Sequence, residues 1–187
     1  MLKRTIGLYY KYIVAKIKYR GRVKFNGFTV VYAFPGSNID FVGSGQIIDS
    51  YPLSNLTGLY QRTIIVARYG GKIEIGEQCG ISGSTIYAFD SIKIGSYTRV
   101  GANCKIIDND FHPLELEYRH KRLNKEHTKR KPIVIGNDCF IGANSIILKG
   151  TTLGNNVIVG AGSVVHGTFP DNCIIAGNPA KIVKENI

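Results

Sequence analysis

His112 is the residue of this chain best suited to acid–base chemistry. It stands in the stretch DNDFHPLELE, residues 108–117, which has carboxylates at Asp108 and Asp110 and a proline at position 113. Histidine titrates near neutral pH, so it can take a proton from a hydroxyl or an amine, and a nearby carboxylate or carbonyl can fix its tautomer. Proline restricts the backbone just after the ring. The competing interpretation is structural, with His112 capping a strand through a hydrogen bond.

The other histidines and the cysteines favour structural roles. His120 and His127 lie within a strongly basic segment, where solvent exposure is the expected role. Cys79, Cys104, Cys139 and Cys173 form no CxxC pair and have no histidines at zinc-finger spacing, which argues against a metal site and against a disulfide scaffold. We therefore expect no metal. A zinc carbonic anhydrase built from a repeat fold would need three histidines around the zinc, so we disfavour that class of enzyme.

An aliphatic residue recurs every six residues from Ile135 to Val165, and the same unit appears less regularly from Ile75. The residue directly after the aliphatic one is usually glycine. The residue four positions after the aliphatic one is small or β-branched in every unit, and we call it the small position. A period of six suits a short strand plus a tight corner. Three such sides close a triangular coil, and stacked coils pair in parallel around an aliphatic core. Cys79, Cys104 and Cys139 occupy the small position, so we predict that they are buried thiols.

The N-terminal segment predicts a basic amphipathic helix over residues 2–19. Leu2, Ile6, Tyr9, Ile13 and Ile17 recur at helical spacing. The first acidic residue is Asp40, and eight basic residues precede it: Lys3, Arg4, Lys11, Lys16, Lys18, Arg20, Arg22 and Lys24. Two placements stay open. The helix caps the open end of the solenoid, or it lies on anionic lipid. Nucleic-acid binding is disfavoured, because the tyrosines among these basic residues share the apolar stripe or its margin.

The six-residue rhythm stops between Ile106 and Ile133, where a charged segment replaces it. A solenoid tolerates an insertion at a corner, so we predict a projecting loop over residues 108–132. Loops on rigid scaffolds often carry function, and His112 stands where the last regular strand meets this loop.

These repeats, with VGAGSVV and IIAGNPAKIV near the C-terminus, resemble the hexapeptide-repeat acyltransferases over roughly residues 70–184. The resemblance implies an all-β solenoid, a left-handed parallel β-helix. It implies one acyltransferase domain over 1–187: a basic helix region at 1–24, a β-helix at 25–184 interrupted by the loop, and a C-terminal tail at 170–187. It also implies a homotrimer with active sites between subunits.

The sequence DNDFHP is similar to the histidine loop of galactoside, maltose and capsule-sugar O-acetyltransferases. By that resemblance His112 is the general base that lets an acceptor hydroxyl attack acetyl-CoA, the co-substrate. The resemblance further assigns the oxyanion-side backbone amide to Ala143, the pantetheine contact to Ala161, and the nucleotide phosphates to Lys181 and Lys184. Ser82 and Asp90 align with sugar-contacting positions.

We therefore expect a sugar O-acetyltransferase of surface-polysaccharide synthesis, with a saccharide acceptor. An N-acetyltransferase acting on a nucleotide-linked amino sugar is the first alternative. A non-catalytic β-helix scaffold is the alternative from another class. We expect a cytoplasmic location, because no signal sequence is evident and no apolar run approaches the roughly 20 residues needed to span a bilayer. Contact with the inner face of the membrane through the basic N-terminus fits the charge.

Overall fold

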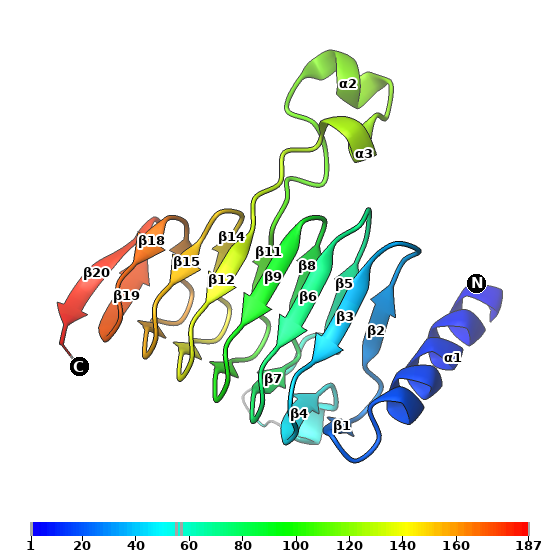
Figure 1. Ribbon diagram of the computed structural model, residues 1–187, viewed down its shortest axis with the longest axis horizontal. Helices are drawn as coiled ribbons and strands as arrows, with labels where there is room; N and C mark the ends of the chain where they lie inside the picture. The colour runs from blue at the N-terminus through cyan, green and yellow to red at the C-terminus, as the bar shows by residue number, and fades with distance from the viewer. Residues whose placement is uncertain (1, 55, 57, 187) are drawn as a thin grey trace.

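Each hexapeptide forms a short strand and a corner, and successive strands turn around a triangular coil (Figure 1). The fold is seen in a computed structural model that describes residues 2–54, 56 and 58–186. The first residue of each repeat points inward, so that Ile135, Ile141 and Ile147 are at most 1% exposed. Burying such a side chain stabilises the fold by about 1.5–3 kcal/mol, which makes the aliphatic ladder the main source of stability.

The strands stack into three flat faces, which we call A, B and C. Face A has eight strands: β1 (Val23–Asn26), β4 (Gln46–Asp49), β7 (Gly80–Ser82), β10 (Arg99–Val100), β13 (Phe140–Ile141), β16 (Ile158–Val159), β19 (Cys173–Gly177) and β20 (Ala180–Glu185). Face B has six: β2 (Val30–Ala33), β5 (Ile64–Ala67), β8 (Thr85–Ala88), β11 (Lys105–Ile107), β14 (Ile146–Leu148) and β17 (Val164–Val165). Face C also has six: β3 (Asn38–Phe41), β6 (Lys72–Ile75), β9 (Ser91–Ile94), β12 (Ile133–Ile135), β15 (Thr152–Leu153) and β18 (Thr168–Phe169).

Three edges join these faces, and each edge is a column of corners. The AB edge comprises residues 27–29, 50–54, 56, 58–63, 83–84, 101–104, 142–145 and 160–163. The BC edge comprises residues 34–37, 68–71, 89–90, 108–132, 149–151 and 166–167. The CA edge comprises residues 42–45, 76–79, 95–98, 136–139, 154–157 and 170–172. Neighbouring strands on each face pair in parallel, except that β19 and β20 pair antiparallel.

The small position of the repeat lies inside the corners, where each of three cysteines at this position donates a hydrogen bond to a glycine carbonyl of the next coil. The Sγ atoms of Cys79, Cys104 and Cys139 lie 3.0, 3.2 and 3.1 Å from the carbonyl oxygens of Gly95, Gly142 and Gly154. Burial raises the pKa of all three thiols. The prediction of buried thiols is confirmed.

At one corner, the small position is filled by a different residue from the one that the sequence pattern predicts. After Ile81 the sequence pattern assigns Thr85 to the small position, but Ser84 fills it and donates to the carbonyl oxygen of Gly101 at 2.9 Å. The reason is that only residues 83–84 separate β7 from β8, so this corner is short. Thr85 instead accepts a hydrogen bond at Oγ1 from the Gln61 side chain at 2.9 Å.

Helix α1 (Leu2–Lys18) lies beside β2 at the N-terminal end of the solenoid (Figure 1). Ala15 and Tyr19 are buried, the Tyr19 hydroxyl donates to the carbonyl oxygen of Ile39 at 2.8 Å, and Tyr12 meets Phe25 edge to face. This helix therefore caps the end.

The capping face of α1 is not the stripe that the spacing indicates. Of that stripe, Ile13 is 41% and Ile17 is 70% exposed, while the side chains of Leu2, Ile6 and Tyr9 lie outside the described residues. The packed face carries aromatic rings because they reach the rings of Phe25 and Phe41 across the open end.

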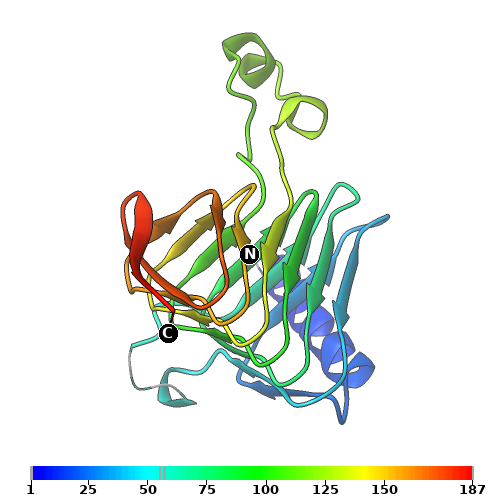
Figure 2. The ribbon, with the colours of Figure 1, turned by 60° about the vertical axis from the view of Figure 1, so that its left-hand side comes forward.

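Two excursions leave the solenoid at its edges. Residues 50–54, 56 and 58–63 leave the AB edge and include the short 3-10 helix η1 (Pro52–Ser54). Residues 108–132 leave the BC edge and carry two short helices, α2 (Leu116–His120) and α3 (Asn124–His127), which project well away from the coils (Figure 2). None of the helices in the described ranges is long and apolar enough to cross a membrane.

Candidate active site

A narrow neck holds the base of the loop that carries His112. The outgoing residues 108–110 run antiparallel to the returning residues 129–131. The amide of Asp110 donates to the carbonyl oxygen of Lys129 at 3.1 Å, and the amide of Lys131 donates to the carbonyl oxygen of Asp108 at 2.9 Å. Asn109 and Arg130 form a bridge between these two bonds. His112 follows this neck directly, so its backbone is tied to a rigid edge.

The carboxylate of Asp108 anchors the neck to the preceding coil. This residue is fully buried. Its Oδ1 accepts from the amide of Phe89 at 2.7 Å and from the side chain of Asn109 at 3.0 Å, and its Oδ2 accepts from the amide of Asp90 at 2.8 Å. Burial raises the pKa of this carboxyl, and the three N–H donors oppose that rise.

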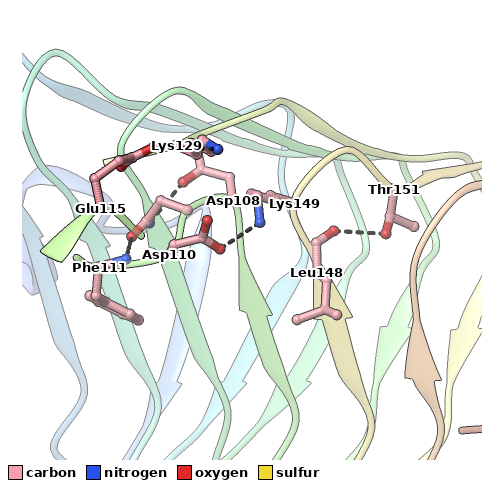
Figure 3. A network of polar contacts seen from close by, with 9 residues as sticks. Asp108, Asp110, Phe111, Glu115, Lys129, Leu148, Lys149 and Thr151 are labelled. Carbon is pink, nitrogen blue, oxygen red and sulfur yellow. Dashed lines mark hydrogen bonds and ion pairs between the residues drawn. The ribbon is translucent and has the colours of Figure 1, made fainter. Parts of the chain in front are cut away.

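Asp110 joins the neck to the following coil. Its Oδ1 lies 2.5 Å from the ammonium of Lys149 on the BC edge, and both side chains are mostly buried (Figure 3). The carbonyl of Asp110 accepts the amide of His112 at 2.7 Å. Phe111 between them has a φ of 60°, a left-handed conformation supported by its amide bond to Oδ1 of Asn109 at 2.9 Å. The turn leaves the His112 side chain exposed.

An aromatic cluster and a proline fix the residues on either side of His112. The ring of Phe111 lies 5.0 Å from that of Tyr87 and 6.1 Å from that of Phe89. Pro113 is buried on the other side. The backbone of His112 is thus held between two packed neighbours while its imidazole reaches solvent, which is the arrangement a general base requires.

Ala143 and Ala161 lie one above the other on the AB edge. The carbonyl of Ala143 accepts the amide of Gly162 at 2.8 Å, and a Cβ added at Gly142 would fall 2.6 Å from the amide nitrogen of Ala161. Ala143 is half-buried and Ala161 is exposed, so both lie at the surface of the edge. Within the described residues, the amides of Ala143 and Ala161 donate to no protein acceptor, so both N–H groups are available to a bound carbonyl or amide.

Lys181 and Lys184 lie on β20, the last strand of face A, with Lys181 nearer the AB edge and Lys184 nearer the CA edge. On β20, Lys181 pairs with Ala176 and Lys184 with Ile174, with a register shift between Ile174 and Ile175. Cross-strand partners share a face, and Ile174 and Ala176 alternate with the buried Cys173 and Ile175. Both ammonium groups therefore lie on the outer side of face A, where phosphates can reach them.

Ser82 and Asp90 lie on different edges. Ser82 ends β7 beside the AB edge, and its hydroxyl lies 3.4 Å from Oδ2 of Asp49. Asp90 lies on the BC edge, where its amide binds Asp108, so it shares the neck with His112.

One chain does not bring all of the predicted site residues together. His112 and Asp90 lie on the BC edge, whereas Ala143 and Ala161 lie on the AB edge. Face B separates the two edges by about four to five residues per coil, or roughly 15 Å at 3.3 Å per residue. A base and an oxyanion donor that act on one transfer must lie within a few ångströms of the reacting atoms.

Several residues near these edges carry no sequence signal that singled them out. Lys149 holds the neck through Asp110, and because the period of six runs through Lys149 without a break, the repeat pattern gave no signal for this lysine. On the AB edge, the amide of Tyr60 donates to Oδ1 of Asn103 at 3.0 Å, so the excursion contacts this edge in the coil that follows Ser82. A cavity of about 660 Å³ lies beneath the excursion. It is lined by Phe28, Val30, Ser50, Tyr51, Pro52, Leu59, Tyr60, Gln61, Arg62 and Ile64.

In the part of the chain that the structure describes, no group of three or more histidine, cysteine or acidic side chains is arranged to hold a metal ion. The candidate site therefore consists of a histidine on one edge and of backbone amides and lysines on another.

Comparison with known proteins identifies the repeat. Residues 132–166 match the family described as "Hexapeptide repeat of succinyl-transferase". The galactoside O-acetyltransferase of Escherichia coli (strain K12) is 33% identical over 120 residues, which cover 63% of this chain and 56% of that protein. The chain spans about half the length of the curated relatives it matches.

Two solved structures share the whole architecture. The polysialic acid O-acetyltransferase OatWY superposes with a TM-score of 0.64 and 25% identity over 89% of this chain and 83% of that one. Galactoside acetyltransferase in complex with coenzyme A gives a TM-score of 0.51 and 21% identity over 99% of this chain and 80% of that one, a likeness of fold alone. The chain is thus a left-handed parallel β-helix of hexapeptide repeats that resembles the hexapeptide-repeat acetyltransferases in sequence and in fold.

Proposed function

We propose that this protein transfers acetyl groups from acetyl-CoA to a hydroxyl of a sugar, in the synthesis of a surface polysaccharide. The observation that carries the proposal is His112, an exposed imidazole whose backbone is anchored on both sides by a buried neck. A histidine that only capped a strand would not need Asp108, Asp110 and Lys149 to fix the turn beneath it.

In the proposed reaction His112 takes the proton of the acceptor hydroxyl while the hydroxyl oxygen attacks the thioester carbonyl carbon. The negative charge that develops on the carbonyl oxygen is stabilised by a hydrogen bond from the amide of Ala143. The carbon–sulfur bond then breaks, and His112 gives the proton to the departing CoA sulfur. The products are an acetyl ester and CoA, and no acyl-enzyme forms.

The acetyl-CoA would lie along the AB edge. The small side chains of Ala143 and Ala161 and their available amides suit the narrow pantetheine arm, and Lys181 and Lys184 suit the nucleotide phosphates as point charges. Complexes of this fold with coenzyme A support the assignment of the ligand.

The proposed site needs two chains, because the AB and BC edges of one chain are separated by face B. In a homotrimer, the BC edge of one subunit would stand beside the AB edge of the next, so that His112 faces Ala143 across the interface. Ser82 from one side and Asp90 from the other would then contact the acceptor.

Polysaccharide synthesis as the setting rests on the likeness to the polysialic acid O-acetyltransferase. The reaction would take place in the cytoplasm. Transfer to the amine of a nucleotide-linked amino sugar is the second candidate. The observation that favours it is the set of exposed cations on the loop. Lys121 and Lys129 pair with Glu117 and Glu115, so Arg122 and Lys125 are the cations best suited to a pyrophosphate.

The test measures CoA release from acetyl-CoA with a panel of saccharides and nucleotide-linked amino sugars. On the best acceptor, His112→Ala should lower kcat by at least about 100-fold, the usual contribution of a general base. His120→Ala is the matched control, since His120 is an exposed histidine of the same loop on α2, and its rate should equal that of the wild type.

Three outcomes separate the hypotheses. An unchanged rate for His112→Ala would refute the general base. A product that resists hydroxylamine would be an amide and would replace O-acetylation by N-acetylation. A protein that binds no acetyl-CoA in calorimetry would be a scaffold rather than an enzyme.

A further inference from the structure

Helix α1 carries an exposed apolar strip, in which Ile13 and Ile17 face away from the packed side and Val14 borders the cavity between α1 and β2. Ile13 is 41%, Val14 44% and Ile17 70% exposed. Residues three and four apart lie on one face of a helix, so these side chains form one strip. The opposite face is the one that packs, through Tyr12, Ala15 and Tyr19. Among the described elements none lies beyond α1 at this end (Figure 1).

Basic side chains border this strip on both sides. At 3.6 residues per turn, Lys16 falls on one side of Ile13 and Ile17 and Lys18 falls on the other, and Arg20 follows in the turn directly after α1. All three are exposed. Each of the ion pairs found among the described residues lies elsewhere, on face C or in the 108–132 loop and its neck, so these cations are not neutralised by the protein.

The basic side chains beside the strip indicate which kind of surface can cover it. A second copy of the same helix would bring its own cations against these, because no acidic residue precedes Asp40. An anionic bilayer supplies both missing components: acyl chains for the isoleucines and negative headgroups for the lysines and arginine.

We propose that the outer face of α1 docks on the surface of an anionic lipid bilayer. The helix lies in the plane of the interface, with Ile13, Val14 and Ile17 inserted and Lys16, Lys18 and Arg20 at the headgroups. The inner face stays packed on β2, so the solenoid is held rigidly against the membrane. This inference does not depend on the acetyl transfer, since it uses no residue of the proposed site.

The test is co-flotation of the full chain with vesicles of phosphatidylcholine alone and of phosphatidylcholine mixed with phosphatidylglycerol. Binding should require phosphatidylglycerol and should weaken as salt rises. Lys16→Gln with Lys18→Gln should weaken binding by about 25-fold, at about five-fold for each cation near an anionic surface. Ile13→Ser with Ile17→Ser should weaken it by at least about ten-fold, because the inserted area is lost.

Matched controls separate these effects from folding and from overall charge. Lys121→Gln with Lys125→Gln removes the same charge from the 108–132 loop, and Val134→Ser removes an apolar side chain that is 39% exposed on face C. Both controls should bind vesicles as the wild type does, with an unchanged melting temperature.

Two results would overturn the proposal. One is equal binding to neutral and anionic vesicles, or none to either. The other is a change in the size of the protein in solution, measured by light scattering, when Ile13 and Ile17 are replaced while vesicle binding is unaffected. The strip would then be a contact between chains.

Discussion

Asp108 is the single residue that ties the His112 loop to the solenoid most directly. Its two carboxylate oxygens accept three N–H bonds from the preceding coil and from Asn109, all inside the protein. A buried carboxylate is tolerated when its oxygens are satisfied in this way. Asp108 is therefore a positioning residue for His112.

Asp108→Asn should destabilise the fold by about 1–3 kcal/mol, because the amide NH₂ would face a backbone N–H instead of accepting it. Urea unfolding measures this change. Asp138→Asn, an exposed aspartate, is the control with the same loss of charge and should change the stability by less than about 0.5 kcal/mol.

The difference between wild type and Asp108→Asn should also depend on pH. Burial raises the folded-state pKa of Asp108 above the ordinary value of about 3.9, so between these two values the folded protein binds the proton more tightly than the unfolded chain. The stability that comes from this difference in pKa is fully present below about pH 4. It is lost as the pH rises through the folded-state pKa. The advantage of the wild type should therefore shrink from about pH 4 upward. An advantage that grows would show that the three N–H bonds outweigh burial.

The sequence could indicate His112 but not the residues beneath it. His112 is conspicuous because it interrupts a periodic pattern beside Asp108 and Asp110. Lys149, in contrast, sits 39 positions from Asp110, and their contact arises only because the BC edge stacks their coils. Such a pairing follows from the register of the solenoid, which one sequence does not reveal.

Among the elements, the corners impose the strictest geometry. Gly136 on the CA edge lies so close to the next coil that an added Cβ would fall 2.3 Å from the carbonyl oxygen of Gly154. The obstacle is backbone, which cannot move without shifting the ladder. This close approach explains why glycine recurs directly after the aliphatic position.

Gly136→Ala should therefore lower the free energy of unfolding by about 1–3 kcal/mol or more, as overpacking of a tight interior does. Gly7→Ala is the matched control, since nothing lies within 4 Å of its added Cβ and its position is helical. That change should raise the stability of α1 by up to about 1 kcal/mol. Thermal unfolding followed by circular dichroism distinguishes the two, and a neutral Gly136→Ala would contradict the close approach.

Helix α1 shows the limit of periodicity at this scale. The helical spacing of Ile13 and Ile17 indicates the most apolar face, but the fold packs the aromatic face instead. Tyr12 and Tyr19 reach Phe25 and Phe41 across the open end, whereas a stripe of isoleucines would leave those rings without edge contacts. The choice of face depends on the shape of the first coil.

At the scale of the whole molecule, the proposed site is divided between the BC edge of one subunit and the AB edge of another. A chain that lacks the base should then complement a chain that lacks the CoA strip. His112→Ala and Ala161→Trp, each expected to be inactive alone, should regain about a quarter of the wild-type activity when equal amounts of the two chains are co-assembled at random.

The recovered activity is measured with purified mixed oligomers carrying different tags. A mixture no more active than its parents would mean that each site lies within one chain, and the roughly 15 Å separation across face B would then require a large movement of the loop.

The architecture as a whole was the part most fully predicted from the sequence. An unbroken period of six from Ile135 to Val165 leaves only a short strand and a corner for each unit, and the triangular solenoid is confirmed. The early coils were less evident because β3 and β4 lie among irregular corners, although their inward residues Ile39, Phe41 and Ile48 are as buried as those of later coils.

The antiparallel pairing of β20 affects how one molecule can stack on the end of another. The first and last strands of a parallel stack leave backbone N–H and C=O groups unpaired. One solenoid can therefore in principle pair end to end with the next and form a fibre. On face A, β20 covers the last parallel strand with an antiparallel one, and α1 covers β2 at the other end. Face A is thereby closed to parallel extension at the C-terminal end and face B is covered at the N-terminal end, so a second solenoid could not continue all three faces at either end.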